Sequence, residues 1–314
     1  MSHTDFQDFF NRSPVILGEG AVIERLRRSS ELELDPFIVN SGFIYDPTKK
    51  NAISKIYREY LDIGAEFELP IFISTATWRA NRQRIADAGY ADRDVNRDNF
   101  RFLDELRNCY GDYASMIVIS GLLSCRGNAY NEAEALSSEE AREFHEWQAG
   151  KLANAGVDLL LAATLPSFSE AKGLAMAMAG TGLPYIVSFV VRPEGTLLDG
   201  TPLREAVSGI DAGVQPQPLA YMINCSHASF FKSALLHASN SSEQVRQRMT
   251  GLLANTAALT PEELDDSNAL VSEDPEVFGR SVAELHRELG MKIVGGCCGT
   301  DNRHIRSLAS NLVE

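Results

Sequence analysis

The sequence predicts an α/β protein with the fold of a (β/α)₈ barrel. Short apolar segments recur eight times along 314 residues, segments with helical spacing lie between them, and polar residues follow the apolar segments. This alternation is typical of eight parallel strands whose carboxyl ends meet on one face. A doubly wound open sheet shows the same alternation and is the alternative fold.

The expected strands are short and apolar, and several of them stop at glycine or at polar residues. Residues 14–17, for example, read Pro-Val-Ile-Leu and precede Gly-Glu-Gly. A continuous apolar run of this length, bounded by turn-forming residues, fits a strand that is buried on both faces. We expect strands at residues 14–17, 68–73, 115–119, 157–162, 185–191, 219–223, 249–253 and 292–294.

Helical spacing or capping residues mark the segments between these strands. Ile53, Tyr57 and Tyr60 lie three or four positions apart, which places them on one helical face. Ser137 precedes two glutamates, as at a capped helix start. We expect helices at residues 21–28, 47–63, 82–87, 96–109, 137–155, 169–179, 202–210, 228–236, 275–289 and 301–312, and an acidic exposed loop at 260–274.

Composition narrows the classes of partner. The net charge of −14 argues against nucleic acid or an anionic membrane, because both require clustered basic residues. No apolar run approaches the roughly 20 residues of a membrane span, and the first residues do not read as a signal peptide. Five cysteines, an odd number, do not suggest a secreted disulfide framework. We expect one cytoplasmic domain over residues 1–314 that acts on small molecules, with its oligomeric state open, a homo-oligomer included.

Polar side chains follow the expected strand ends. In a barrel these positions converge on the face where barrel enzymes carry their active sites. The residues are Glu19, Thr75, Ser120, Thr164, Arg192, Asn224, Asn255 and Cys297.

Three cysteines share these positions. Cys225 lies just after the sixth expected strand, and the adjacent pair Cys297 and Cys298 follows the eighth. Catalytic zinc sites use three protein ligands and keep one position open. Side chains alternate on a strand, so both neighbours reach one ion only if glycines such as Gly295 and Gly299 let the backbone turn. We therefore favour zinc (Zn²⁺) over two alternatives, namely buried structural cysteines and a vicinal redox pair.

The double-cysteine segment at residues 295–300, Gly-Gly-Cys-Cys-Gly-Thr, together with Asn-Cys at 224–225, resembles motifs of the zinc-dependent homocysteine S-methyltransferase family. Segments 17–21, 164–170 and 199–203 are similar to that family's segments after strands one, four and five. The resemblance implies a barrel, one zinc ion held by the three cysteines, and methyl transfer to a thiol, for which homocysteine, giving methionine, is the first candidate. The donor stays open between S-methylmethionine, S-adenosylmethionine and a betaine.

The implied chemistry agrees with general principles. A free thiol has a pKa near 8.5 and is mostly protonated at neutral pH, and coordination to zinc removes that proton. The thiolate then takes a methyl group from a sulfonium or quaternary ammonium donor, and no further catalytic side chain is implied. A cationic donor suits an aromatic wall, for which Trp78 and Phe43 are candidates.

Two residues depart from the family. Relatives hold the amino group of homocysteine with an Asp after strand one and a Glu after strand four, whereas this chain has Glu19 and Ala163 there. Ala163 cannot bind an ammonium group. Two alternatives follow: the same zinc chemistry on a different thiol, or a non-catalytic zinc- or thiol-binding protein. The predicted substrate-binding residues are Glu19, Thr164, Asn224, Asn255 and Trp78.

Overall fold

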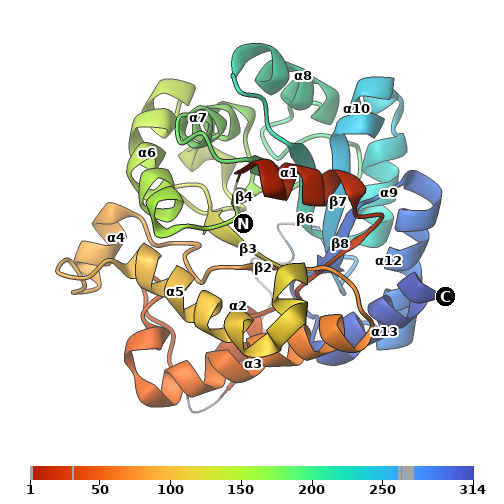
Figure 1. Ribbon diagram of the computed structural model, residues 1–314. Coiled ribbons are helices and arrows are strands. Elements are labelled where there is room, and N and C mark those ends of the chain that lie inside the picture. The colour runs from red at the N-terminus through yellow and green to blue at the C-terminus, as the bar shows by residue number, and fades with distance from the viewer. Residues whose placement is uncertain (1–2, 30–31, 261–262, 264–271) are drawn as a thin grey trace.

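Eight parallel strands close into a barrel in chain order in the computed structural model, which describes residues 3–29, 32–260, 263 and 272–314 (Figure 1). The ring closes where the first strand pairs with the last, with Leu17 opposite Val294. The barrel prediction is confirmed and the open sheet is excluded. The strands are β1 (Ile16–Gly18), β2 (Ile71–Ser74), β3 (Ile117–Leu123), β4 (Leu159–Leu165), β5 (Tyr185–Phe189), β6 (Ala220–His227), β7 (Met249–Asn255) and β8 (Ile293–Gly296).

Helices cover the outside of the barrel, and each of the ten expected helices is present, three with the predicted bounds and seven with shifted ends. Short 3₁₀ helices join some of them: η1 (Phe43–Tyr45), η2 (Asn108–Met116), η3 (Glu132–Glu134) and η4 (Ala238–Asn240). The α-helices are α1 (His3–Arg12), α2 (Ile23–Arg27), α3 (Pro47–Glu66), α4 (Arg82–Asp87), α5 (Val95–Arg107), α6 (Ser138–Ala155), α7 (Phe168–Ala179), α8 (Leu203–Gly213), α9 (Ala228–Leu236), α10 (Glu243–Arg248), α12 (Pro275–Leu289) and α13 (Asn302–Val313).

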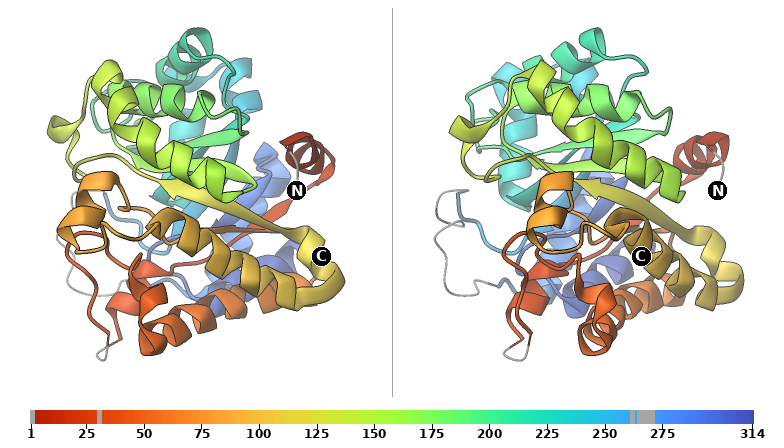
Figure 2. Two further views of the ribbon diagram at one scale, coloured as in Figure 1. Left: turned by 60° about the vertical axis from the view of Figure 1, so that its left-hand side comes forward. Right: turned by 90° about the vertical axis from the view of Figure 1, so that its left-hand side faces the viewer.

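Two helices were not predicted, α10 and α1. The first helix lies across one end of the barrel, and α4 lies toward the other end (Figures 1 and 2). Phe6, Phe9 and Phe10 of α1 are buried against the apolar residues at the start of the strands. The amino-terminal end of the barrel is therefore closed by aromatic side chains.

Local capping explains both ends of α6. Ser137 caps α6 in a capping box, in which the Glu140 carboxylate accepts from the Ser137 backbone N–H at 3.1 Å. The helix ends at Gly156, which has a φ of 103° that glycine adopts without strain. The capped helix start that the sequence predicted is confirmed.

Some strands run further than expected, which changes the position of the polar residues. Thr164 lies within β4 and Asn224 lies within β6, near the carboxyl ends of these strands and not beyond them. Ser120 lies in the middle of β3, where its hydroxyl donates to Ser74 Oγ at 3.0 Å. The prediction that Ser120 follows a strand end is wrong. Most of the acidic segment 260–274 lies outside the described residues.

The apolar side chains form two layers, one inside the barrel and one between strands and helices. The inner layer includes Ile16, Phe72, Val118, Leu161, Ile186, Met222 and Leu253. The outer layer includes Leu17, Ile73, Ile119, Leu160, Val187, Ile223 and Val294.

Among the described residues, no helix is both long enough and apolar enough to cross a membrane.

The seam between β1 and β8 depends on two glycines. A Cβ atom on Gly295 would lie 2.5 Å from the Gly18 Cα atom, which is backbone and cannot move aside. The close approach lets the Gly296 N–H donate to the Glu19 carbonyl at 2.9 Å. The seam therefore sets the chain that follows β1 beside the chain that follows β8.

We expect the substitution Gly295→Ala to lower the free energy of unfolding by about 1–3 kcal/mol, because the methyl group overpacks the seam. Chemical denaturation measures the difference. Gly150→Ala in α6 is the matched control, since nothing lies within 4 Å of its Cβ position. Alanine favours a helix by up to about 1 kcal/mol over glycine, so the control is neutral or stabilising. Equal stability of Gly295→Ala and the wild type would contradict this account.

Candidate functional site

A cavity of about 590 Å³ opens at the carboxyl end of the barrel. Most of the predicted polar residues line it, but Ser120 and Arg192 do not, and neither does the aromatic candidate Phe43. Phe43 is 1% exposed and belongs to the core, so it is not available as an aromatic wall. The predicted residues that line the cavity are Glu19, Thr75, Trp78, Ala163, Thr164, Asn224, Cys225, Asn255, Cys297 and Cys298.

The three cysteines lie together in the cavity, as predicted. Their sulfur atoms all lie within 4.8 Å of one another, and Cys225 Sγ is 2.9 Å from Cys297 Sγ. Three thiolates around a tetrahedral zinc ion at Zn–S distances of about 2.3 Å would lie about 3.8 Å apart. The Cys225–Cys297 sulfur distance is shorter than this value, so the sulfur atoms would have to move slightly apart to hold one zinc ion. The fourth side of such a site would face the cavity.

Asn224 holds Cys225 in an unusual backbone conformation. Cys225 and Thr164 have φ values of 54° and 61°, which cost about 1–3 kcal/mol each for residues other than glycine. Asn224 Oδ1 accepts from the Thr164 N–H at 2.8 Å and from Ser188 Oγ at 2.7 Å. Its Nδ2 donates to Thr164 Oγ1 at 2.8 Å and to Cys225 Sγ at 3.4 Å. One amide thus stabilises both strained residues and contacts one sulfur.

The adjacent cysteines sit in a tight turn after β8. Gly299 has a φ of 85°, and the Thr300 hydroxyl donates to the Cys297 carbonyl at 2.7 Å. Asn255 Oδ1 accepts from the Cys298 N–H at 3.0 Å. The glycine-dependent turn that the sequence predicted is present, and side chains from neighbouring elements fix its shape.

Hydrogen bonds among the three thiols shift their pKa values in opposite directions. Hydrogen bonds from Cys297 and Cys298 lower the pKa of Cys225. The hydrogen bond to Cys225 in turn raises the pKa of Cys297 and of Cys298. A cluster that shares charge in this way provides thiolates to a soft cation.

Glu19 presents a buried carboxyl group to the same cavity. It is 8% exposed, and its Oε1 accepts from the Ser74 N–H at 3.0 Å. Its Oε2 is buried and has no hydrogen-bond partner among the described residues. Burial raises the pKa of Glu19 to about 8. A cationic ligand group beside this carboxyl group would lower its pKa and favour the ionised form. The buried carboxyl group is therefore suited to bind a cation.

The remaining predicted substrate contacts differ in what they can still bind. The Asn224 amide already binds protein atoms on both sides, whereas the Asn255 Nδ2 is buried without a partner among the described residues. Trp78 lines the cavity, but the Arg79 guanidinium lies 4.3 Å from the centre of its ring. That charge would repel a cationic donor from the covered face. Ala163 lines the cavity with a methyl group only.

Sequence reasoning missed the part of the wall that comes after β3. Asn128, Ala129 and Tyr130 line the cavity, and negative charge on Cys225 raises the pKa of Tyr130. The available signal was the position of this segment after a strand end, together with an aromatic residue in it. Arg27 and Arg28 of the segment around α2 were also missed at the cavity wall.

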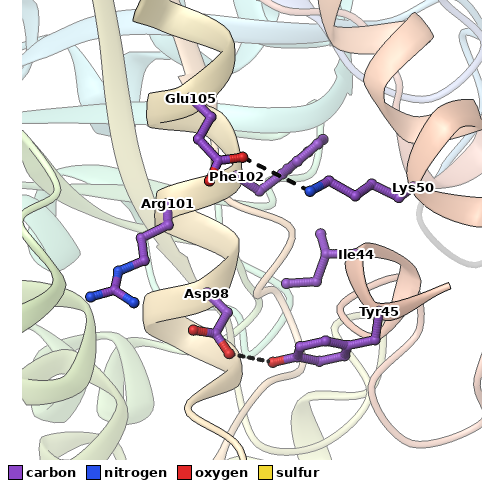
Figure 3. A pocket seen from close by; sticks show the side chains of 7 residues that line it. All are labelled: Ile44, Tyr45, Lys50, Asp98, Arg101, Phe102 and Glu105. Carbon is purple, nitrogen blue, oxygen red and sulfur yellow. Dashed lines mark hydrogen bonds and ion pairs between the residues drawn. The ribbon is translucent and has the colours of Figure 1, made fainter. Parts of the chain in front are cut away.

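A second, shallow pocket of about 180 Å³ lies on the outer side, between η1, α3 and α5 (Figure 3). Its polar groups bind one another: the Tyr45 hydroxyl donates to Asp98 Oδ2 at 2.9 Å, and Lys50 lies 3.9 Å from Glu105. This pocket is remote from the cysteines and offers no comparable set of unpartnered groups.

Comparison with known proteins agrees with the site. The homocysteine S-methyltransferase family model matches residues 16–312. Homocysteine S-methyltransferase YbgG of Bacillus subtilis is 24% identical over 97% of this chain and 96% of its own length. Homocysteine S-methyltransferase of Escherichia coli is 32% identical over 58% of this chain and 56% of its own length.

The fold is also shared with a solved structure. The metallated form of the homocysteine methyltransferase MmuM from Escherichia coli superimposes with a TM-score of 0.74 at 21% identity, covering 96% of this chain and 98% of that one. The family model spans nearly the whole barrel, including both cysteine segments. The chain therefore belongs to the homocysteine S-methyltransferase family.

Proposed function

We propose that the protein is a zinc-dependent S-methyltransferase that moves a methyl group from a sulfonium or quaternary ammonium donor to a thiol, most simply homocysteine, giving methionine. The observation that carries the proposal is the clustering of three cysteine sulfurs within 4.8 Å in a cavity that also holds an unpartnered buried carboxyl group. Both halves of an aminothiol would then find a partner in one cavity.

Cys225, Cys297 and Cys298 would hold the zinc ion. When bound, zinc lowers the pKa of a coordinated thiol, so the acceptor would be present as a thiolate at neutral pH. The acceptor would lie on the cavity side of the cysteines, with its amino group toward Glu19. Asn255 Nδ2, buried beside Cys298, would donate to the acceptor's sulfur or carboxylate.

Glu19 would change its protonation state when the acceptor binds. Because burial raises its pKa to about 8, the carboxyl group keeps its proton at neutral pH until a cation lies against it. An ammonium group at Oε2 would favour the ionised form, and the proton would leave to solvent. The site therefore selects for a positively charged amino group without holding a buried unpaired charge in its absence.

The methyl donor would lie above the acceptor in the outer part of the cavity. In the transfer, the new S–CH₃ bond forms as the bond between the methyl group and the cationic donor atom breaks, and the electron pair returns to that atom. Trp78 has one face covered by Arg79, so it offers a single face to a cationic centre. Arg27, at the cavity wall, is placed to attract a carboxylate of the donor.

A different thiol acceptor is the second candidate, and Ala163 is the observation that favours it. Among the described residues that line the cavity, Glu24 is the other acid besides Glu19, and it is bound to Arg28 at 2.7 Å. A single carboxyl group thus faces the acceptor region, where relatives are expected to have two. The difference in affinity between acceptors with and without an amino group would therefore be smaller here than in such relatives.

The first prediction concerns the metal. Cys225→Ser is expected to lose most of its zinc, because one of three thiolates is removed, and methyl transfer to homocysteine should fall by about 100-fold or more. Elemental analysis and a methionine assay measure the two effects. Cys109→Ser is the control, since Cys109 is exposed and outside the cluster. Wild-type protein that folds without zinc and takes up none would contradict the proposed mechanism, and a zinc-loaded protein that forms no methylated product would favour the non-catalytic alternative.

The second prediction concerns Glu19. Its pKa of about 8 in the folded protein exceeds the unfolded value of 4.5, so the folded state holds a proton that the unfolded state loses. The stabilising contribution is fully present below pH 4.5 and is lost as the pH rises through 8, by at most about 1.4 kcal/mol per pH unit. Denaturation of wild type and Glu19→Gln between pH 5.5 and 8.5 should show this extra decline in the wild type only. Parallel pH profiles would show that the carboxyl group is not buried.

The third prediction concerns Ala163. Ala163→Glu places a second carboxylate at the acceptor region, and a charged hydrogen bond to an ammonium group contributes about 1.5–3 kcal/mol. The ratio of kcat/KM for homocysteine to that for a thiol without an amino group should therefore rise by about 10-fold or more. Ala163→Gln fills the same space without the charge and is the control. A ratio that rises equally in both variants would point to shape instead of charge.

A further inference from the structure

One wall of the cavity is formed by the loop between β3 and α6, which places Asn128, Ala129 and Tyr130 at the cavity surface. Within this loop, residues 124–137, regular secondary structure is limited to the short 3₁₀ helix η3. A loop with so few internal backbone hydrogen bonds keeps one shape only if side chains from elsewhere hold it. The three cysteines line the same cavity, so the shape of this wall bears on any ligand bound beside them.

One buried carboxylate binds both ends of the loop. It belongs to Glu170, which is 1% exposed and lies in the first turn of α7. Glu170 accepts from the Arg126 N–H at 2.7 Å and from the Leu136 N–H at 3.4 Å. These two residues bracket the three that line the cavity. Two points of attachment on one helix therefore limit how far the wall can open.

The carbonyl groups at the two ends of the loop are bound as well. Arg79 donates to the Cys125 carbonyl at 3.1 Å and to the Arg126 carbonyl at 3.2 Å. At the other end, the Ser169 hydroxyl donates to the Leu136 carbonyl at 2.8 Å. Arg126 and Leu136 are thus each bound through their N–H group and through their C=O group.

His145 of α6 contacts Glu170 in turn. Its Nε2 lies 3.2 Å from Glu170 Oε1, and both side chains are 1% exposed. A carboxylate only accepts hydrogen bonds, so this nitrogen carries the hydrogen and donates it. The carboxylate therefore accepts from two backbone N–H groups and one imidazole N–H. Such partners are what an acidic side chain requires in order to lie in the protein interior.

We propose that Glu170 is a positioning residue of the cavity, which holds the loop after β3 in its binding shape before the acceptor arrives. The inference rests on the proposed function, because it concerns the wall beside the acceptor. A wall that is already formed lowers the cost of binding, since no loop has to be ordered when the ligand enters. Loss of this attachment would weaken ground state and transition state alike, which raises KM and leaves kcat unchanged.

Hydrogen exchange of the wild-type protein is the first test, and it needs no substrate. The Arg126 and Leu136 amides should exchange more slowly than the Ala133 amide of the same loop, because Glu170 binds them in the interior. The Ala133 N–H donates to the exposed Asn131 side chain at 3.2 Å and is the internal control. Equal exchange rates at the three amides would overturn the inference.

The second test compares Glu170→Gln with Asp158→Asn. Asp158 is the matched control, since its buried carboxylate accepts from the Ile119 N–H at 2.8 Å and from Arg107 at 2.7 Å. It is not among the described residues that line the cavity. A glutamine presents one accepting oxygen and cannot bind both ends of the loop. Glu170→Gln should therefore raise the exchange rates of the Arg126 and Leu136 amides and raise KM for homocysteine by about 10-fold at unchanged kcat.

Asp158→Asn should lose stability without a change in KM. An unchanged KM in Glu170→Gln, or an equal rise in Asp158→Asn, would overturn the inference. If Glu170→Gln does not fold, the wild-type exchange rates decide the question.

Calorimetric titration of the zinc-loaded proteins with homocysteine separates this inference from the proposed function, because it does not require turnover. A wild type that forms no methylated product, with homocysteine affinity about 10-fold lower in Glu170→Gln than in Asp158→Asn, keeps the inference and rejects the proposed function. Methyl transfer by the wild type, with equal affinity in both variants, does the reverse. A wild type that binds no homocysteine rejects both.

Discussion

The close approach of two backbones at the barrel seam determines where the chemistry can lie. Gly18 and Gly295 come so near each other that neither position has room for a side chain, and this contact closes β8 onto β1. The chain beyond each strand then continues side by side, with the Gly296 N–H bound to the Glu19 carbonyl. One consequence is that the carboxyl group of Glu19 and the sulfurs after β8, which are nearly 280 residues apart in sequence, line one cavity.

Two residues that line the cavity, Cys225 and Thr164, have a strained backbone conformation. Cys225 and Thr164 adopt positive φ values next to shifts of register in β6 and β4, and one amide, that of Asn224, binds both residues. A regular strand would point neighbouring side chains to opposite faces. The irregular strand ends let the barrel keep its ladder of hydrogen bonds and still direct a sulfur and a hydroxyl toward the same ligand region.

The fold could be predicted from the sequence because its signals are repeated. Eight apolar runs and the helices between them each gave weak evidence, and their sum specified the barrel. The cysteine cluster could be predicted because Cys225 lies near the end of β6, Cys297 and Cys298 follow β8, and the carboxyl ends of these strands converge. α1 was missed, although Phe6, Phe9 and Phe10 lie three and four positions apart, which is the spacing of one helical face. The cavity wall after β3 was missed because the position of that segment depends on tertiary contacts of Arg79 and Glu170, which have no local sequence pattern.

The aromatic side chains at the amino-terminal end of the barrel also bear on the order in which substrates would bind and products would leave. Phe6, Phe9 and Phe10 pack against the strand starts, and in the part of the chain that the structure describes the cavity beside the cysteines opens at the opposite end of the barrel. If both substrates of a two-substrate reaction used that opening, they would pass through it one after the other. The acceptor, bound at the floor beside the cysteines, would have to arrive before the donor that covers it, and the demethylated donor would have to leave before the product thioether. The short helix at the far end would in this way impose a kinetic sequence on a site that it never touches.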